Sequence, residues 1–116
     1  MARILVADCS DPDFSTALAK VLALKGFGTV ATACGTAEAV WMQILAEPPD
    51  LLLIDRRVGA EILTKLRATP RAQAVRVLVI DSNYKHGHEV PGADGYIQSP
   101  APPHAYIQAV RDALAT

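Results

Sequence analysis

The sequence predicts an α/β fold built on one parallel sheet, and three observations lead to that prediction. Short runs rich in Leu, Val and Ile alternate with longer stretches of helical periodicity. Most of the short runs are apolar on both faces, as in strands that helices cover from both sides. The 116 residues suffice for one domain, and 51% of them are hydrophobic, enough for a core. We therefore expect a single domain over residues 1–116, with an open doubly wound sheet.

The expected strands lie at regular intervals, with a helix after most of them. The strand runs are 4–7, 29–33, 51–54, 77–80 and 95–97. In the first helix, Asp11 is the expected N-cap, Pro12 the first helical residue and Gly26 the stop. Thr36 is expected to begin the second helix, which Pro48 ends.

The second half of the chain is less regular. A short third helix is expected over 60–68, before Pro70, and the last helix begins near Pro102 and Pro103. Two glycines and a proline interrupt the segment 81–94, which has no helical stripe. A fourth helix in that segment is therefore expected to be a single turn or missing.

Charge and composition argue against several classes of protein. Eleven basic and twelve acidic side chains give a net charge of −1. This charge does not favour binding to nucleic acid or to an anionic membrane. The N-terminal apolar run stops at Asp8, so it predicts neither a signal peptide nor a spanning helix, and we expect a cytoplasmic protein. Cys9 and Cys34 match no disulfide framework or zinc pattern, and we interpret them as reduced thiols.

Three carboxylates, Asp8, Asp55 and Asp81, each follow directly on an expected strand. In a doubly wound sheet, ligands bind outside the carboxyl ends of the strands, so these side chains are expected to line one rim. Converging carboxylates raise one another's pKa unless a positive charge lies among them. Mg²⁺ could supply that charge, and Arg56 or Arg57 is the competing internal solution.

The sequence resembles the receiver domain of bacterial response regulators over essentially the whole chain. The segments that carry the resemblance are 3–8 with 11–14, 49–55, and 92–97 with Pro100. The resemblance implies a flavodoxin-like sheet with strand order 2-1-3-4-5 and a role in two-component phosphorelay signalling without enzymatic activity. It implies protein partners, either a histidine kinase, another signalling protein or an output domain, and allows a homodimer. Neither nucleic acid nor a membrane is an expected partner.

The same resemblance implies roles for individual residues. Asp55 stands at the phosphoacceptor position, where the family's aspartate forms an acyl phosphate. Asp8, Asp55 and the backbone carbonyl of Arg57 stand at the positions that hold Mg²⁺. In the family this metal bridges the acceptor and the phosphoryl oxygens and offsets their charge.

Several positions depart from the family's pattern. Cys9 occupies the place of a second acid, which weakens the expected Mg²⁺ site. Asp81 occupies the place of a Thr or Ser that contacts the phosphoryl group, and only the adjacent Ser82 offers a hydroxyl. Ser99 occupies the place of a lysine that pairs with phosphoryl oxygen. The segment after Asp55 is also shorter than the family's loop. These departures predict slow or absent phosphorylation.

Three functions remain open at this stage. The first is a pseudo-receiver that acts through protein–protein contact with little or no phosphorylation. The second is a weak aspartyl phosphoacceptor at Asp55 with Mg²⁺, and the third is a metal or small-ligand sensor built from Asp8, Asp55 and Asp81. His86 and His88 are interpreted as solvated loop residues, since no third metal ligand is near in sequence. The acidic loop after the first strand argues against a flavin phosphate site.

Overall fold

The fold is described from a computed structural model, which covers residues 2–8, 11–81 and 90–115. Its strands are β1 (Ala2–Ala7), β2 (Gly28–Thr32), β3 (Leu51–Asp55), β4 (Arg76–Asp81) and β5 (Gly95–Gln98). They form one sheet in the order β2-β1-β3-β4-β5, and every neighbouring pair is parallel. The expected fold class and strand order are confirmed.

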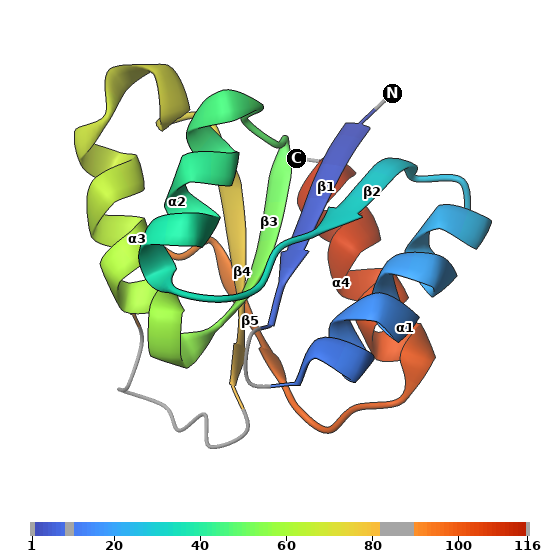
Figure 1. The fold of residues 1–116 in the computed structure, drawn as a ribbon. Coiled ribbons are helices and arrows are strands. Elements are labelled where there is room, and N and C mark those ends of the chain that lie inside the picture. Colours follow the sequence, from blue (N-terminus) through green and yellow to red (C-terminus); the bar gives the residue numbers. More distant parts are fainter. Residues whose placement is uncertain (1, 9–10, 82–89, 116) are drawn as a thin grey trace.

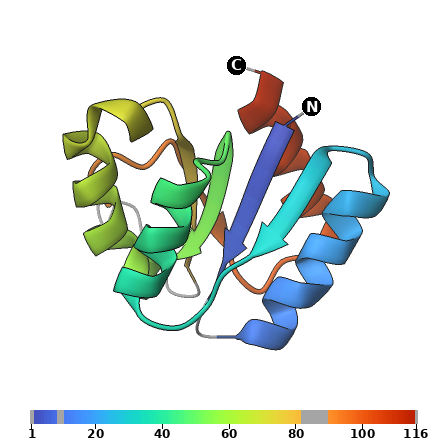
Figure 2. The same cartoon turned by 45° about the horizontal axis from the view of Figure 1, so that its top comes forward.

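Helices cover both faces of this sheet. They are α1 (Pro12–Leu24), α2 (Ala37–Ala46), α3 (Arg56–Ala68) and α4 (Pro103–Ala115), with a short 3-10 helix η1 (Pro70–Ala72) after α3. The helices α2 and α3 lie on one face, and α1 and α4 lie on the other (Figure 1). Figure 2 shows the same three layers from a second direction. None of the helices over the described residues is long and apolar enough to cross a bilayer.

The central strand β3 explains why the core has two parts. All five of its residues are buried, and successive side chains point to opposite faces of the sheet. Leu52 and Ile54 pack into the cluster under α2 and α3, whereas Leu51 and Leu53 pack into the cluster under α1 and α4. A strand that is apolar at every core-facing position therefore requires helices on both sides, as the sequence predicted.

The N-caps of α1 and α2 follow the sequence prediction. The Asp11 side chain accepts a hydrogen bond from the Phe14 N–H at 3.1 Å, and the Thr36 hydroxyl accepts one from the Ala39 N–H at 3.1 Å. Each cap satisfies a backbone donor that the first turn of a helix leaves without a partner. Gly26, with a φ of +78°, ends the turn that follows α1.

The predicted start of α3 was wrong. A helix over 60–68 was expected, but α3 begins at Arg56, directly after Asp55, and ends as expected at residue 68. The reason is a packing contact: Gly59 is buried, and a Cβ built on it would lie 3.3 Å from a methyl carbon of Ile54. The small residue thus lets the first turn of α3 lie close against β3, where the sequence suggested a loop.

The connection from β4 to β5 is held by Arg67 of α3. Its guanidinium donates to the Gly92 carbonyl at 2.7 and 3.1 Å and to the Asp94 carboxylate at 3.0 Å. Asp94 also accepts a hydrogen bond from the Val77 N–H at 2.7 Å, which fixes the entry to β5. The expectation of a shortened or missing fourth helix concerns residues 82–89, which lie outside the described residues.

Candidate functional site

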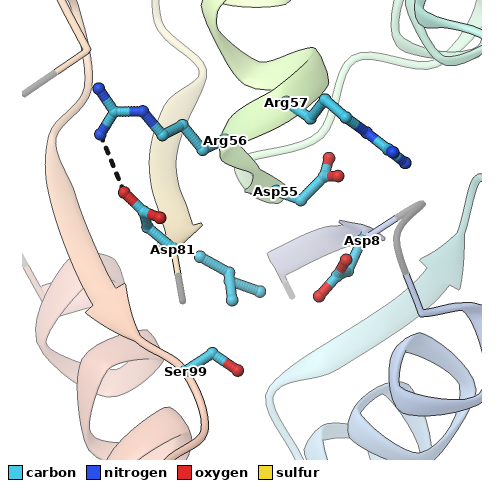
Figure 3. A pocket seen from close by; sticks show the side chains of 7 residues that line it. Asp8, Asp55, Arg56, Arg57, Asp81 and Ser99 are labelled. Atoms are coloured by element: carbon cyan, nitrogen blue, oxygen red, sulfur yellow. Dashed lines mark hydrogen bonds and ion pairs between the residues drawn. The ribbon is translucent and has the colours of Figure 1, made fainter. Parts of the chain in front are cut away.

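A cavity of about 410 Å³ opens at the carboxyl ends of the central strands. Its lining consists of Asp8, Asp55, Arg56, Arg57, Ile80, Asp81 and Ser99 (Figure 3). The three carboxylates that the sequence placed at one rim therefore lie around one cavity. Asp8, Asp55 and Asp81 are only 5%, 5% and 6% exposed, so their charges lie largely out of water.

Strand register sets the relative positions of these carboxylates. The residue before Asp8 pairs with the residue before Asp55, so the two aspartates leave the sheet at the same level. Asp55 pairs with Ile80, which places Asp81 one residue further along. Since neighbouring strands lie about 4.8 Å apart, the backbones of Asp8 and Asp55 leave the sheet as close neighbours.

Asp55 is the least satisfied polar group of the site. Both of its carboxylate oxygens are buried, and neither has a hydrogen-bond partner among the described residues. Burial raises the pKa of Asp55, and the negative charge of Asp8 raises it further. The nearby backbone N–H of Val58 and the positive charge of Arg57 lower this pKa in part. Among the described residues, no hydrogen bond of normal geometry reaches either carboxylate oxygen. Asp55 therefore holds its proton to a higher pH than an ordinary aspartate does.

Asp81 has an internal counter-ion. Nη1 of Arg56 lies 2.9 Å from Oδ2 of Asp81, in a charge-assisted hydrogen bond. The Asp81 side chain is 7% exposed and the Arg56 side chain 38%, so the pair lies partly out of water. Of the two arginines that the sequence offered as counter-charges, Arg56 is the one that binds Asp81.

The backbone of Asp8 is fixed by Ser15 of α1. The Ser15 hydroxyl donates to the Asp8 carbonyl at 2.9 Å and accepts from the Asp8 N–H at 3.2 Å. The Cys34 thiol also donates to this carbonyl at 3.6 Å. Sequence reasoning missed Ser15, whose only signal was a small hydroxyl one turn after the helix N-cap and beside the apolar stripe of α1.

Ser99 follows β5 and closes the cavity opposite Asp55. Its backbone N–H donates to the Asp81 carbonyl at 3.1 Å, and the Tyr106 hydroxyl donates to its Oγ at 3.3 Å. Tyr106 is almost fully buried, with its ring 5.3 Å from that of Phe14. The position at which the family carries a lysine is therefore filled by an anchored neutral hydroxyl.

Four residues that the sequence analysis discussed lie outside the described residues. They are Cys9, Ser82, His86 and His88. The proposed substitution of Ser82 for the family's hydroxyl residue therefore stays a prediction.

Two of the three expected metal ligands, the side chains of Asp8 and Asp55, line the same cavity. Arg57 is the second residue of α3, and a helical carbonyl points along the axis toward the C-terminus, away from Asp55. The prediction that this carbonyl binds Mg²⁺ therefore stays a prediction, which the helical conformation of Arg57 does not favour. Among the described residues, no three His, Cys, Asp or Glu side chains are placed to hold a metal. With Asp8 and Asp55 as the remaining donors, the described part of the site does not fit a resident Mg²⁺.

Comparison with known proteins rests on structure. No protein-family model matches the sequence, and no curated protein sequence does. Solved structures match over nearly the whole chain. One is a response regulator receiver domain from Methanospirillum hungatei, with 24% identity and a TM-score of 0.84; the match covers 99% of this chain and 94% of that protein's chain. The receiver domain of NarL from Mycobacterium tuberculosis has 24% identity, a TM-score of 0.82 and coverages of 99% and 98%. The chain has the receiver-domain fold.

A third receiver-fold structure is an orphan response regulator of H. pylori, with 20% identity, a TM-score of 0.82 and coverages of 97% and 96%. In the receiver fold of this chain, the departures from the family's pattern meet at one cavity. Asp81 is bound by Arg56, and Ser99 is bound by Tyr106. Positive charge at this cavity comes from the first two residues of α3, Arg56 and Arg57.

Proposed function

We propose that this chain is a pseudo-receiver in phosphorelay signalling, which acts through protein–protein contact with little or no phosphorylation at Asp55. The observation that carries the proposal is the state of Asp55. Its two carboxylate oxygens are buried and have no hydrogen-bond partner among the residues that the structure describes, and its pKa is raised. An acceptor must present a charged oxygen to the phosphorus of a donor, and burial together with the charge of Asp8 disfavours that charged form of Asp55.

Charge around Asp55 also opposes an acyl phosphate. A phosphoryl group would add roughly 1.5 to 2 negative charges to a site whose lining already holds three carboxylates against two arginines. Each like-charge pair at about 6 Å costs on the order of 3 kcal/mol at an effective dielectric constant of 20. The absence of a lysine at position 99 removes a charge-assisted hydrogen bond of about 1.5–3 kcal/mol. Together these effects favour the unphosphorylated protein.

The proposed partners are proteins: a histidine kinase, another signalling protein, an output domain or a second copy of the chain. We further propose a non-catalytic, cytoplasmic role. The receiver fold supports the signalling class, since the solved structures that match this chain include several response regulators. A sensor built from three carboxylates is less favoured, because Arg56 already binds Asp81.

The test is direct phosphorylation. The purified chain is incubated with acetyl phosphate or phosphoramidate and Mg²⁺, and its intact mass is measured under conditions that preserve acyl phosphates. We expect no added phosphoryl group. A phosphorylated fraction that is lost in the Asp55→Asn variant would overturn the proposal.

A weak phosphoacceptor is the second candidate function. It is supported by the retention of Asp8 and Asp55 at one level of the sheet, as the family requires. This alternative predicts that the Asp55→Ala variant loses both the phosphoryl label and the downstream response. An unchanged response in that variant excludes it.

A further inference from the structure

We infer that Arg56 and Arg57 are built-in counter-charges, which take the place of a divalent cation at the carboxylate cavity. The inference deepens the proposed pseudo-receiver function and rests on it for the role of the cavity. The cavity holds three carboxylates, but the backbone carbonyl expected as a further metal ligand belongs to a helical residue.

The first step concerns Asp55. A buried carboxylate without a hydrogen-bond partner is costly, and a nearby cation is the usual solution. A resident Mg²⁺ needs oxygen ligands in octahedral geometry, and the carbonyl that would contribute one is turned along α3. Apart from protonation of Asp55 itself, compensation of its charge must therefore come from cationic groups of the protein or from weakly held ions.

The second step is that both arginines reach the cavity. Arg56 binds Asp81 at 2.9 Å on one side of the cavity. Arg57 lines the same cavity, and its side chain extends past Asp55 on the side away from Arg56 (Figure 3). Asp8 lies on this side too, so each arginine faces a different part of the acidic lining.

The third step is the position of the arginines in α3. The N-terminal turn of a helix carries a partial positive charge and favours acidic side chains, yet the first turn of α3 contains no acid and begins with two arginines. The helix dipole does not explain this placement. Side chains in a helix lean toward its N-terminus, and for α3 that direction leads to the cavity and its carboxylates.

The arginines also lie where they do because β3 passes directly into α3. With no loop after Asp55, the two next residues are fixed by the first helical turn beside the cavity. The same junction that removes a metal ligand therefore delivers two cationic side chains. The direct connection from β3 to α3 therefore accounts for both the orientation of the carbonyl and the position of the two arginines.

Binding of Mn²⁺, used as a probe for a divalent cation, tests this inference. The concentration of free Mn²⁺ is followed by electron paramagnetic resonance for the wild type and for the Arg57→Gln, Asp55→Asn and Lys20→Gln variants. Lys20 is exposed on α1, so Lys20→Gln is the control that removes the same charge elsewhere. The Arg57 side chain makes no hydrogen bond with the described residues, so its replacement is expected to leave folding intact, which circular dichroism verifies.

We expect the wild type to bind no more Mn²⁺ than the Asp55→Asn variant. Arg57→Gln should bind Mn²⁺ about three- to tenfold more strongly than Lys20→Gln, because a neighbouring like charge is removed. Stronger binding by the wild type than by Asp55→Asn overturns the inference, as does equal binding by Arg57→Gln and Lys20→Gln. Neither result concerns phosphorylation, so the mass measurement still decides the proposed function separately.

Discussion

Arg56 and Asp81 join the start of α3 to the end of β4 through an ion pair of 2.9 Å at the edge of the carboxylate cavity. The pair connects two elements that both leave the sheet at this edge. It also neutralises the carboxylate that lies at the family's hydroxyl position. The stability of the fold and the reactivity of the site are therefore coupled at this contact.

Replacing Arg56 should destabilise the protein. Arg56→Gln removes the charged partner that Arg56 provides to the buried Asp81, and we expect the free energy of unfolding to fall by about 1–3 kcal/mol, less than for a fully buried pair because Arg56 is partly exposed. Urea denaturation of Arg56→Gln, Asp81→Asn and the double variant gives the coupling energy. Additive effects of the two single changes would show that the pair contributes nothing.

Replacing Asp55 should change how stability depends on pH. The pKa of Asp55 is raised in the folded state above its ordinary value of 3.8, so the native protein binds this proton more tightly than the unfolded chain. The contribution of Asp55 to the free energy of unfolding is then highest below about pH 4 and falls as the pH rises through the folded-state pKa.

Asp55→Asn removes this dependence. We expect the variant to gain stability relative to the wild type as the pH rises from about 4 to 7, with the gain levelling off above the folded-state pKa. Urea denaturation of both proteins over this range measures it, and the other titrating groups largely cancel in the difference. A difference that stays constant with pH would contradict the raised pKa.

Arg67 should contribute more to stability than its partly exposed position on α3 suggests. Its guanidinium makes five hydrogen bonds, including those to Gly92 and Asp94. Arg67→Met should lower the free energy of unfolding by about 2–3 kcal/mol. The matched control is Lys65→Met. Lys65 forms an exposed ion pair with Glu61 at 3.9 Å and lies 6.0 Å from the centroid of the Trp41 ring, so its replacement should cost less than about 1 kcal/mol. Equal losses in thermal or urea unfolding would contradict this prediction.

Restoring the family's side chains should restore acceptor chemistry in part. The Asp81→Thr, Ser99→Lys double variant removes a negative charge and adds a positive one beside Asp55. We expect a measurable phosphorylated fraction with acetyl phosphate and Mg²⁺ where the wild type has none. Adding Asp55→Asn to the double variant provides the control and should abolish the label. If the double variant stays unlabelled while folded, the buried state of Asp55 is the stronger barrier.

Much of the site followed from local sequence pattern, because a strand-end position is set by the strand itself. Asp8, Asp55 and Asp81 each end an apolar run, and parallel strands bring such ends to one edge. The start of α3 did not follow from pattern. It depends on the burial of Gly59 against β3, a tertiary contact that overrides the usual effect of glycine on a helix.

The resemblance also could not show that Arg57 lies in a helix, which bears on the predicted ligand role of its carbonyl. A backbone group can be assigned to a metal only when the local conformation is known, and the resemblance carried a loop conformation onto a helical residue. Ser15 was missed because its bonds to Asp8 join residues of different elements. Features that depend on one element were predictable, and features that depend on contacts between elements were not.

The direct passage from β3 into α3 has a mechanical consequence. A flexible segment after Asp55 would let a chemical event at this residue be absorbed locally or passed to a neighbouring surface. Here no flexible segment separates Asp55 from α3, and at the other end of α3 Arg67 forms a hydrogen bond with the turn before β5. A displacement at Asp55 is therefore transmitted by movement of the whole of α3 or is not transmitted. This arrangement suits a binding surface of constant shape better than a conformational switch.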